Sequence, residues 1–196
     1  MDLIFPAIEF AARAHAGQYR KRTKIPYIVH PLAVAKLLIE NNFPAQVVAA
    51  GVLHDTVEDT NVTLDEIRAA FGDEVASLVG AVTEPPRTFS WEERKRAILR
   101  QMETAPLSVL AIECADKLDN LRDIQAHSAR DGEAVWERFN RPKPYQHWYY
   151  ASIAQVFLRR ISNSDDSLLF RDFVDAVQAV FGSLTVDSQI AQTESE

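Results

Sequence analysis

The sequence contains a single cysteine, Cys114, among its 196 residues. A disulfide framework within the chain is therefore excluded, and one thiol is typical of a reducing compartment. The N-terminus lacks the positively charged start and the long apolar core of a signal peptide. The apolar runs are also much shorter than the ~20 residues that cross a bilayer. We therefore expect a soluble, cytoplasmic protein with no membrane span.

Positive charge is scarce as well. Lys and Arg together number 21 against 28 Asp and Glu, which gives a formal net charge of −7. Proteins that bind nucleic acid normally carry a basic surplus, so nucleic acid is not expected as a partner. A local basic cluster can still bind one small anion. Nothing in the sequence indicates an oligomeric state.

Glycine is rare, with six in the chain, and alternating β-branched runs are missing. Apolar residues instead recur at spacings of three and four, which predicts an all-α fold. Hydrophobic residues make up 47% of the chain, enough for the core of one domain. We expect one helical bundle over residues 1–182 and a polar, flexible tail over 183–196. Helices are expected at roughly 4–16, 31–41, 45–59, 63–71, 73–83, 90–103, 107–123, 130–139, 145–162 and 167–181.

Two of these helices begin with the spacing of a capping box. Thr63 stands three residues before Glu66, and Ser90 stands three residues before Glu93. Loops are expected at 17–29, which contains a run of basic residues, and at 84–89, where two adjacent prolines end a helix.

The most informative segment reads His54-Asp55-Thr56-Val57-Glu58-Asp59 and follows a buried-looking apolar run. A neighbouring imidazole and carboxylate can both face one metal ion. On the helix expected over residues 45–59, Glu58 shares a face with His54, and Asp59 shares a face with Asp55. Several ionisable groups on one short face are costly unless a cation or a charged substrate offsets them.

Two further residues can complete a metal site with His54 and Asp55. His30 stands at the expected start of a helix, and Asp116 interrupts an apolar helical pattern. Each also has a plainer interpretation, His30 as a capping or core histidine and Asp116 as the partner of a nearby Lys or Arg. A lone His-Asp pair has little specificity. The order His, His-Asp, Asp on helices favours the metal site over these alternatives.

Four motifs together resemble the hydrolase domain of the RelA/SpoT family, in particular the stand-alone small alarmone hydrolases of the HD superfamily. The resemblance covers about residues 5–160 and rests on Tyr19-Arg20-Lys21, Pro26-Tyr27-Ile28-Val29-His30-Pro31, Val52-Leu53-His54-Asp55-Thr56-Val57-Glu58-Asp59-Thr60 and Ala115-Asp116-Lys117-Leu118-Asp119-Asn120-Leu121. It implies hydrolysis of guanosine tetra- or pentaphosphate to GDP or GTP plus pyrophosphate. The resemblance implies one Mn²⁺ held by His30, His54, Asp55 and Asp116. It also implies that Glu58 and Asp59 position and activate the attacking water.

The substrate contacts are expected from basic, amide and aromatic side chains. Arg20 and Lys21 can bind phosphates, and Asn120 shares a helix face with Asp116. The resemblance adds Lys95 and Tyr149, although a basic run on a helix is often exposed and a regularly spaced tyrosine often belongs to the core. The roles of Arg22 and Lys24 stay open, because this loop is about one residue longer and more basic than the family suggests.

Alternative functions keep the same site. One is an HD phosphohydrolase acting on the 2′-phosphate of NADPH, on an adenosine alarmone or on another nucleotide. Another is a sensor that binds an alarmone without turnover, which is disfavoured because Glu58, Asp59 and the four expected ligands are all present. No synthetase region is recognised, so only hydrolysis is expected. His15, His127 and His147 receive no role, and Cys114 is expected to be a buried thiol.

Overall fold

The computed structural model describes residues 3–161 and 167–185 of the chain. Over these residues the protein is helical and has no strand, apart from one isolated bridge between Tyr19 and Pro26. The prediction of an all-α fold is therefore confirmed. The chain divides into two compact units, Met1–Asp116 and Lys117–Glu196. Most of the predicted tail, residues 186–196, lies outside the described residues, and the limits of the predicted domain stay a prediction.

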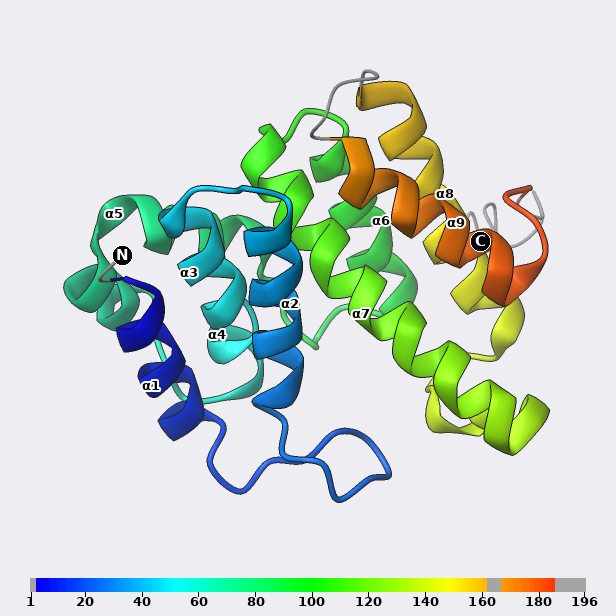
Figure 1. Ribbon diagram of the computed structural model, residues 1–196, viewed down its shortest axis with the longest axis horizontal. Coiled ribbons are helices and arrows are strands. Elements are labelled where there is room, and N and C mark those ends of the chain that lie inside the picture. The colour runs from blue at the N-terminus through cyan, green and yellow to red at the C-terminus, as the bar shows by residue number, and fades with distance from the viewer. Residues whose placement is uncertain (1–2, 162–166, 186–196) are drawn as a thin grey trace. The chain divides into compact units, whose positions relative to one another are not determined.

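Helix α3 is the centre of the first unit. The helices of this unit are α1 (Ile4–Ala14), α2 (Val29–Glu40), α3 (Ala45–Leu53), α4 (Thr56–Asp59), α5 (Leu64–Val82), α6 (Trp91–Met102) and the start of α7 (Leu107–Asp131). Helix α3 is buried from Val47 to Leu53 and packs against α1, α2 and α5 (Figure 1). A Cβ atom at Gly51 would lie 2.5 Å from Leu38 Cδ1, so glycine permits the close approach of α2 and α3.

The single helix predicted over residues 45–59 is wrong. Helix α3 ends at Leu53, a turn formed by His54 and Asp55 follows, and α4 begins at Thr56. The Thr56 hydroxyl donates a hydrogen bond of 2.6 Å to the Leu53 carbonyl, and His54 Nδ1 lies 2.8 Å from the Gly51 carbonyl. These side-chain bonds to backbone carbonyls compete with regular helix geometry. His54 and Asp55 are consequently presented from a turn, not from a continuous helix face.

The predicted helix boundaries at 63, 72 and 90 are confirmed. Both capping boxes form, since each N-cap side chain accepts from the N3 backbone and each N3 glutamate accepts from the N-cap backbone. Gly72 interrupts α5 with a φ of 86°, a conformation that favours glycine, and so separates the two predicted segments.

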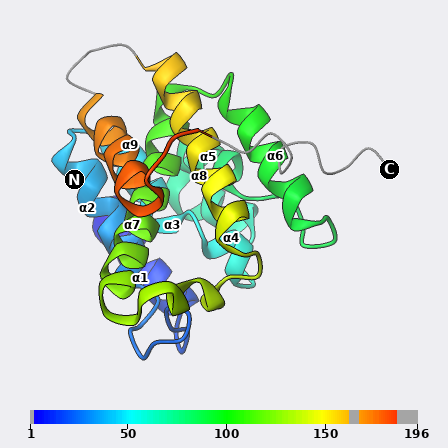
Figure 2. The same cartoon turned by 90° about the vertical axis from the view of Figure 1, so that its right-hand side faces the viewer.

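The second unit contains the rest of α7, the 3-10 helix η1 (Gly132–Arg138), α8 (Lys143–Arg160) and α9 (Ser167–Phe181). Helix α7 runs eight residues past its predicted end at 123, and the helix predicted at 130–139 is a 3-10 helix. Gly132 has a φ of 60° and ends α7 there. Helices α8 and α9 pack together (Figure 2). The ring centroid of Phe157 in α8 lies 4.9 Å from that of Phe170 and 5.2 Å from that of Phe173 in α9.

Among the helices of residues 3–161 and 167–185, none combines the length and the apolar character that crossing a membrane would need.

Candidate metal centre

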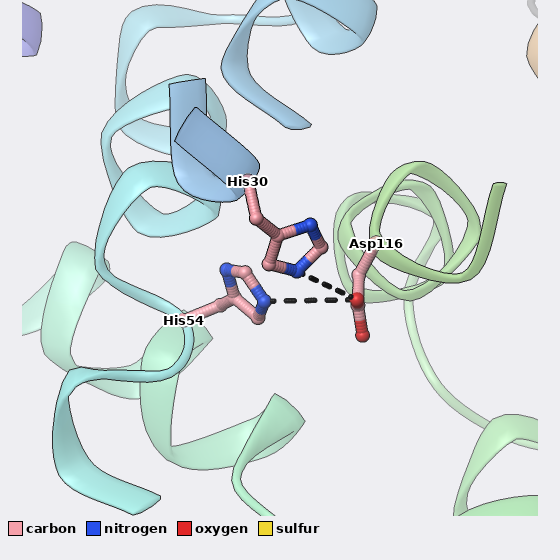
Figure 3. Close-up of side chains that lie close together, drawn as sticks. All are labelled: His30, His54 and Asp116. Atoms are coloured by element: carbon pink, nitrogen blue, oxygen red, sulfur yellow. Dashed lines mark ion pairs between the residues drawn. The ribbon is translucent and has the colours of Figure 1, made fainter. Parts of the chain in front are cut away.

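Three buried side chains from separate elements of the first unit face one another. His30 comes from the first turn of α2, His54 from the turn after α3, and Asp116 from α7 (Figure 3). Their residues are 2%, 4% and 7% exposed, respectively. The sequence places His30 at the mouth of α2 because Pro31, which follows it, is tolerated in the first turn of a helix.

The distances within this group suit a small cation. Asp116 Oδ1 lies 3.1 Å from His30 Nε2 and 3.8 Å from His54 Nε2 (Figure 3). One potential ligand atom from each of the three residues lies within 4.8 Å of the other two. Two imidazoles and a carboxylate are ligands that divalent transition metals accept. The structure therefore brings together three of the four residues predicted as ligands in an arrangement that can hold a metal ion.

The surroundings of His54 show that these residues fit a cation. Its Nδ1 atom faces the Gly51 carbonyl at 2.8 Å, so Nδ1 carries a proton and donates it. Its Nε2 atom is buried and makes no hydrogen bond of good geometry, although Asp55 Oδ2 lies 3.0 Å away. A buried nitrogen with a free lone pair beside two carboxylates is in an unfavourable environment unless a proton or a metal ion lies between them.

Asp55, the fourth predicted ligand, lies beside the group. Its Oδ2 atom is 3.0 Å from His54 Nε2 and 3.7 Å from His30 Nε2. The same oxygen accepts a hydrogen bond of 2.5 Å from the hydroxyl of Tyr27. Tyr27 belongs to the segment that leads into α2, and no role was predicted for it from the sequence. Its only sequence signal is its place three residues before His30.

The charges of the cluster shift its pKa values strongly. Burial lowers the pKa of His54, but the charges of Asp55 and Asp116 outweigh burial and raise it to about 9. Burial raises the pKa of Asp55, but the imidazoles of His54 and His30 outweigh it and hold this pKa well below its usual range. Without a cation, a proton on His54 therefore neutralises part of the carboxylate charge.

The acid pair Glu58 and Asp59 lies on α4, directly after the metal-site turn. Burial, and then the charge of Asp55, raise the pKa of Asp59 above its usual range. The charge of the metal-site turn therefore acts on Asp59. Arg87 Nη2 lies 2.6 Å from Asp59 Oδ1 and 3.9 Å from Glu58 Oε1. The sequence of residues 84–89 indicates only a loop, and it carries no signal that Arg87 contacts the acid pair.

Gln18 links the loop after α1 to α4. Its amide nitrogen donates a hydrogen bond of 2.9 Å to the Asp59 carbonyl, and its Oε1 lies 2.8 Å from Nδ1 of His15. His15, for which no role was predicted, is a buried histidine. Gln18 and His15 thereby connect the segment that precedes Arg20 to the helix that carries the acid pair.

The predicted substrate contacts have different surroundings. Arg20 and Lys21 lie in a loop that is closed by a hydrogen bond of 2.9 Å from the Arg20 N–H to the Ile25 carbonyl. The exposed interpretation of Lys95 is wrong, because its side chain is only 14% exposed and forms an ion pair with Glu84. Asn120 and Tyr149 lie in the second unit, and Tyr149 is buried, as a core tyrosine would be.

Glu84 also pairs with a second cation. Arg94 Nη1 lies 2.6 Å from Glu84 Oε2 and 4.0 Å from Glu58 Oε1. Arg94, Glu84 and Lys95 thus form a largely buried charge cluster next to the acid pair. Of these three residues only Lys95 was predicted to have a role, because ion pairs between α6 and residue 84 cannot be read from a local sequence pattern.

A family profile, sequence relatives and solved structures all identify the same family. The sequence profile described as HD domain matches residues 7–143. The guanosine-3′,5′-bis(diphosphate) 3′-pyrophosphohydrolase MESH1 of Xenopus tropicalis is 45% identical over 63% of this chain and 70% of its own length. Human MESH1 is 42% identical over 62% of this chain and 69% of its own length. A probable GTP pyrophosphokinase of Mycobacterium leprae is 40% identical over 67% of this chain, but the match spans only 18% of that longer protein.

Two solved structures share the fold. The crystal structure of lmo0812 from Listeria monocytogenes matches with a TM-score of 0.74 and 41% identity, over 79% of this chain and 99% of that one. The structure of a metazoan SpoT orthologue that hydrolyses ppGpp matches with a TM-score of 0.73 and 26% identity, over 91% of this chain and 95% of that one. This chain therefore belongs to the HD domain family and, within it, to the group of RelA/SpoT-type and MESH1 hydrolase domains.

Proposed function

We propose that this protein hydrolyses the 3′-pyrophosphate of guanosine tetra- or pentaphosphate and releases GDP or GTP plus pyrophosphate. The observation that carries the proposal is the buried group of His30, His54 and Asp116 in a chain that is 45% identical, over 63% of its length, to a hydrolase named for that substrate. We propose a cytoplasmic enzyme of alarmone turnover, in the stringent response, whose hydrolase domain spans residues 1–182 and whose tail spans 183–196.

The proposed cofactor is one Mn²⁺ ion held by His30, His54, Asp55 and Asp116. When bound, such an ion polarises a phosphoryl oxygen and lowers the pKa of a coordinated water. Two observations support this ligand set. The buried Nε2 atom of His54 lacks a hydrogen bond, and Oδ2 of Asp55 faces both histidines.

Glu58 and Asp59 are the proposed catalytic pair. The oxygen of a water molecule bonds to the phosphorus attached to the 3′-oxygen, and the bond from phosphorus to the 3′-oxygen breaks. Glu58 accepts a proton from the water, and the leaving 3′-oxygen takes up a proton from solvent to become a hydroxyl. Asp59 orients the water. Arg87 lies beside both carboxylates of α4, 2.6 Å from Asp59 Oδ1 and 3.9 Å from Glu58 Oε1.

The substrate carries many negative charges, so its binding needs cations beyond the metal. Arg20 and Lys21 are the proposed phosphate contacts, with Arg20 suited to bidentate hydrogen bonds. Lys95 is proposed to contribute a third cation. Asn120 and Tyr149 are proposed to contact the nucleotide, through an amide and an aromatic ring respectively.

The direct test is turnover by the purified protein with Mn²⁺, using guanosine tetraphosphate, NADPH and an adenosine alarmone as separate substrates. We expect guanosine tetraphosphate to yield GDP and pyrophosphate without orthophosphate, and a chelator to abolish the reaction. Rapid release of phosphate from another substrate, with guanosine tetraphosphate untouched, would reject the proposed substrate. Binding of guanosine tetraphosphate without turnover of any substrate would favour the sensor.

The same assay tests the role of Glu58. We expect Glu58→Gln to lose about 10²- to 10⁴-fold in kcat while it still binds Mn²⁺, because the amide keeps the shape and cannot accept the proton. His54→Ala is expected to lose both metal binding and turnover. Glu40→Gln, which alters an exposed carboxylate paired with Lys36, is the control. A nearly full rate in Glu58→Gln would show that Glu58 is not the base.

A further inference from the structure

Tyr27 makes a hydrogen bond to Asp55 that the proposed roles of the metal ligands and of the acid pair do not account for. Its hydroxyl donates a hydrogen bond of 2.5 Å to Oδ2 of Asp55, across 28 residues of sequence. That oxygen is the one that faces His54 and His30, at 3.0 Å and 3.7 Å. The phenol therefore acts on the carboxylate oxygen that points into the metal centre.

The ring of Tyr27 is held from two sides. Its centroid lies 4.8 Å from the ring of His15 and 5.8 Å from the ring of His30. His15 is itself buried and linked to Gln18. Because both neighbours are fixed by the fold, the hydroxyl of Tyr27 has a defined position before any metal binds.

We propose that Tyr27 is a positioning residue of the metal centre, whose hydroxyl holds Asp55 facing His30 and His54 and so strengthens the binding of a divalent cation. This inference rests on the proposed function in that it requires a metal ion at the His30, His54, Asp55 and Asp116 group. Tyr27 itself is not a ligand, because its hydroxyl is already directed at Asp55.

The need for such a residue follows from the position of Asp55. Asp55 lies in the turn between α3 and α4, where its backbone is not part of a regular helix, and its side chain is 18% exposed. A partly exposed carboxylate can rotate towards water. The conformational entropy that it loses when it is ordered then opposes metal binding. The hydrogen bond from Tyr27 keeps the carboxylate turned towards the histidines. Loss of a hydrogen-bond partner behind a metal ligand typically weakens metal affinity roughly 10- to 100-fold.

The test is titration of the metal-free full chain with Mn²⁺ alone, by calorimetry, for the wild type and Tyr27→Phe. Phenylalanine keeps the ring between His15 and His30 and removes only the hydroxyl. We expect the Kd for Mn²⁺ to rise roughly 10- to 100-fold, while kcat at saturating Mn²⁺ stays close to that of the wild type. Tyr19→Phe is the matched control, because Tyr19 lies in the same loop and is 58% exposed. The Kd of this variant for Mn²⁺ is expected not to change.

A double-mutant cycle separates positioning from a general loss of structure. Titrations are made at a temperature at which circular dichroism shows every variant folded. If Tyr27 acts through Asp55, Tyr27→Phe adds no further loss of affinity in an Asp55→Asn background. Equal Kd values for the wild type and Tyr27→Phe, or equal losses in both backgrounds, would overturn the inference and leave the metal centre intact. A wild-type chain that binds no Mn²⁺ would overturn the metal centre itself.

Discussion

The two ring nitrogens of His54 have different surroundings, and this difference makes metal binding compete with a proton. Nδ1 is held by the Gly51 carbonyl, whereas Nε2 faces Asp55 and Asp116. Despite burial, which lowers it, the pKa of His54 is raised to about 9 by these carboxylates. Because this pKa lies above the ordinary value, the metal-free site holds its proton at every pH below about 9.

Metal binding must release that proton, so we expect the apparent affinity for Mn²⁺ to increase as pH rises. The expected slope is up to tenfold per pH unit, which gives about 100-fold between about pH 6 and about pH 8. Calorimetric titration in two buffers of different ionisation enthalpy measures both the affinity and the number of protons released. A pH-independent affinity with no proton release would show that His54 is neutral in the metal-free protein.

At the scale of elements, the short helix α4 depends on contacts from outside it. Its four residues make too short a helix to be stable alone. Gln18 holds its last carbonyl, and Arg87 pairs with its two carboxylates. These contacts come from two separate loops, so the position of the acid pair is set by tertiary structure.

We expect Gln18→Met to lower kcat while the Kd for Mn²⁺ stays nearly unchanged, because α4 carries the acid pair and none of the proposed ligands. Loss of one hydrogen bond of about 1 kcal/mol corresponds to about a fivefold change in rate. Gln101→Met is the matched control, since Gln101 donates a similar bond to the Ala81 carbonyl. Steady-state kinetics with metal titration checks both values. A large loss of Mn²⁺ affinity would mean that Gln18 supports the metal-site turn instead.

The same elements show what could be predicted from the sequence. Apolar spacing and capping boxes predicted the helices. The motif order predicted one metal site of His30, His54, Asp55 and Asp116, and the structure brings His30, His54 and Asp116 close together. The turn between α3 and α4 was missed, because it depends on side-chain bonds to the carbonyls of Gly51 and Leu53. The contacts of Tyr27, Gln18 and Arg87 join residues 28, 41 and 28 positions apart, and local patterns carry no information about such pairs.

At the scale of the whole molecule, all four proposed ligands belong to the unit Met1–Asp116. The proposed Mn²⁺ ion is therefore expected to stabilise that unit directly. When the ligand concentration is about 100 times Kd, binding adds about 2.7 kcal/mol to the free energy of any local opening that destroys the site. We expect Mn²⁺ to slow amide hydrogen exchange in α2 and α3 up to about 100-fold. Helices α8 and α9 carry none of the proposed ligands. Amide hydrogen exchange through local unfolding of these two helices is therefore expected to keep its rate. Exchange measured by mass spectrometry with Mn²⁺ or chelator distinguishes the cases. Equal slowing in α3 and α9 would show that the two units open together, and no slowing in α3 would contradict a metal ion among these residues.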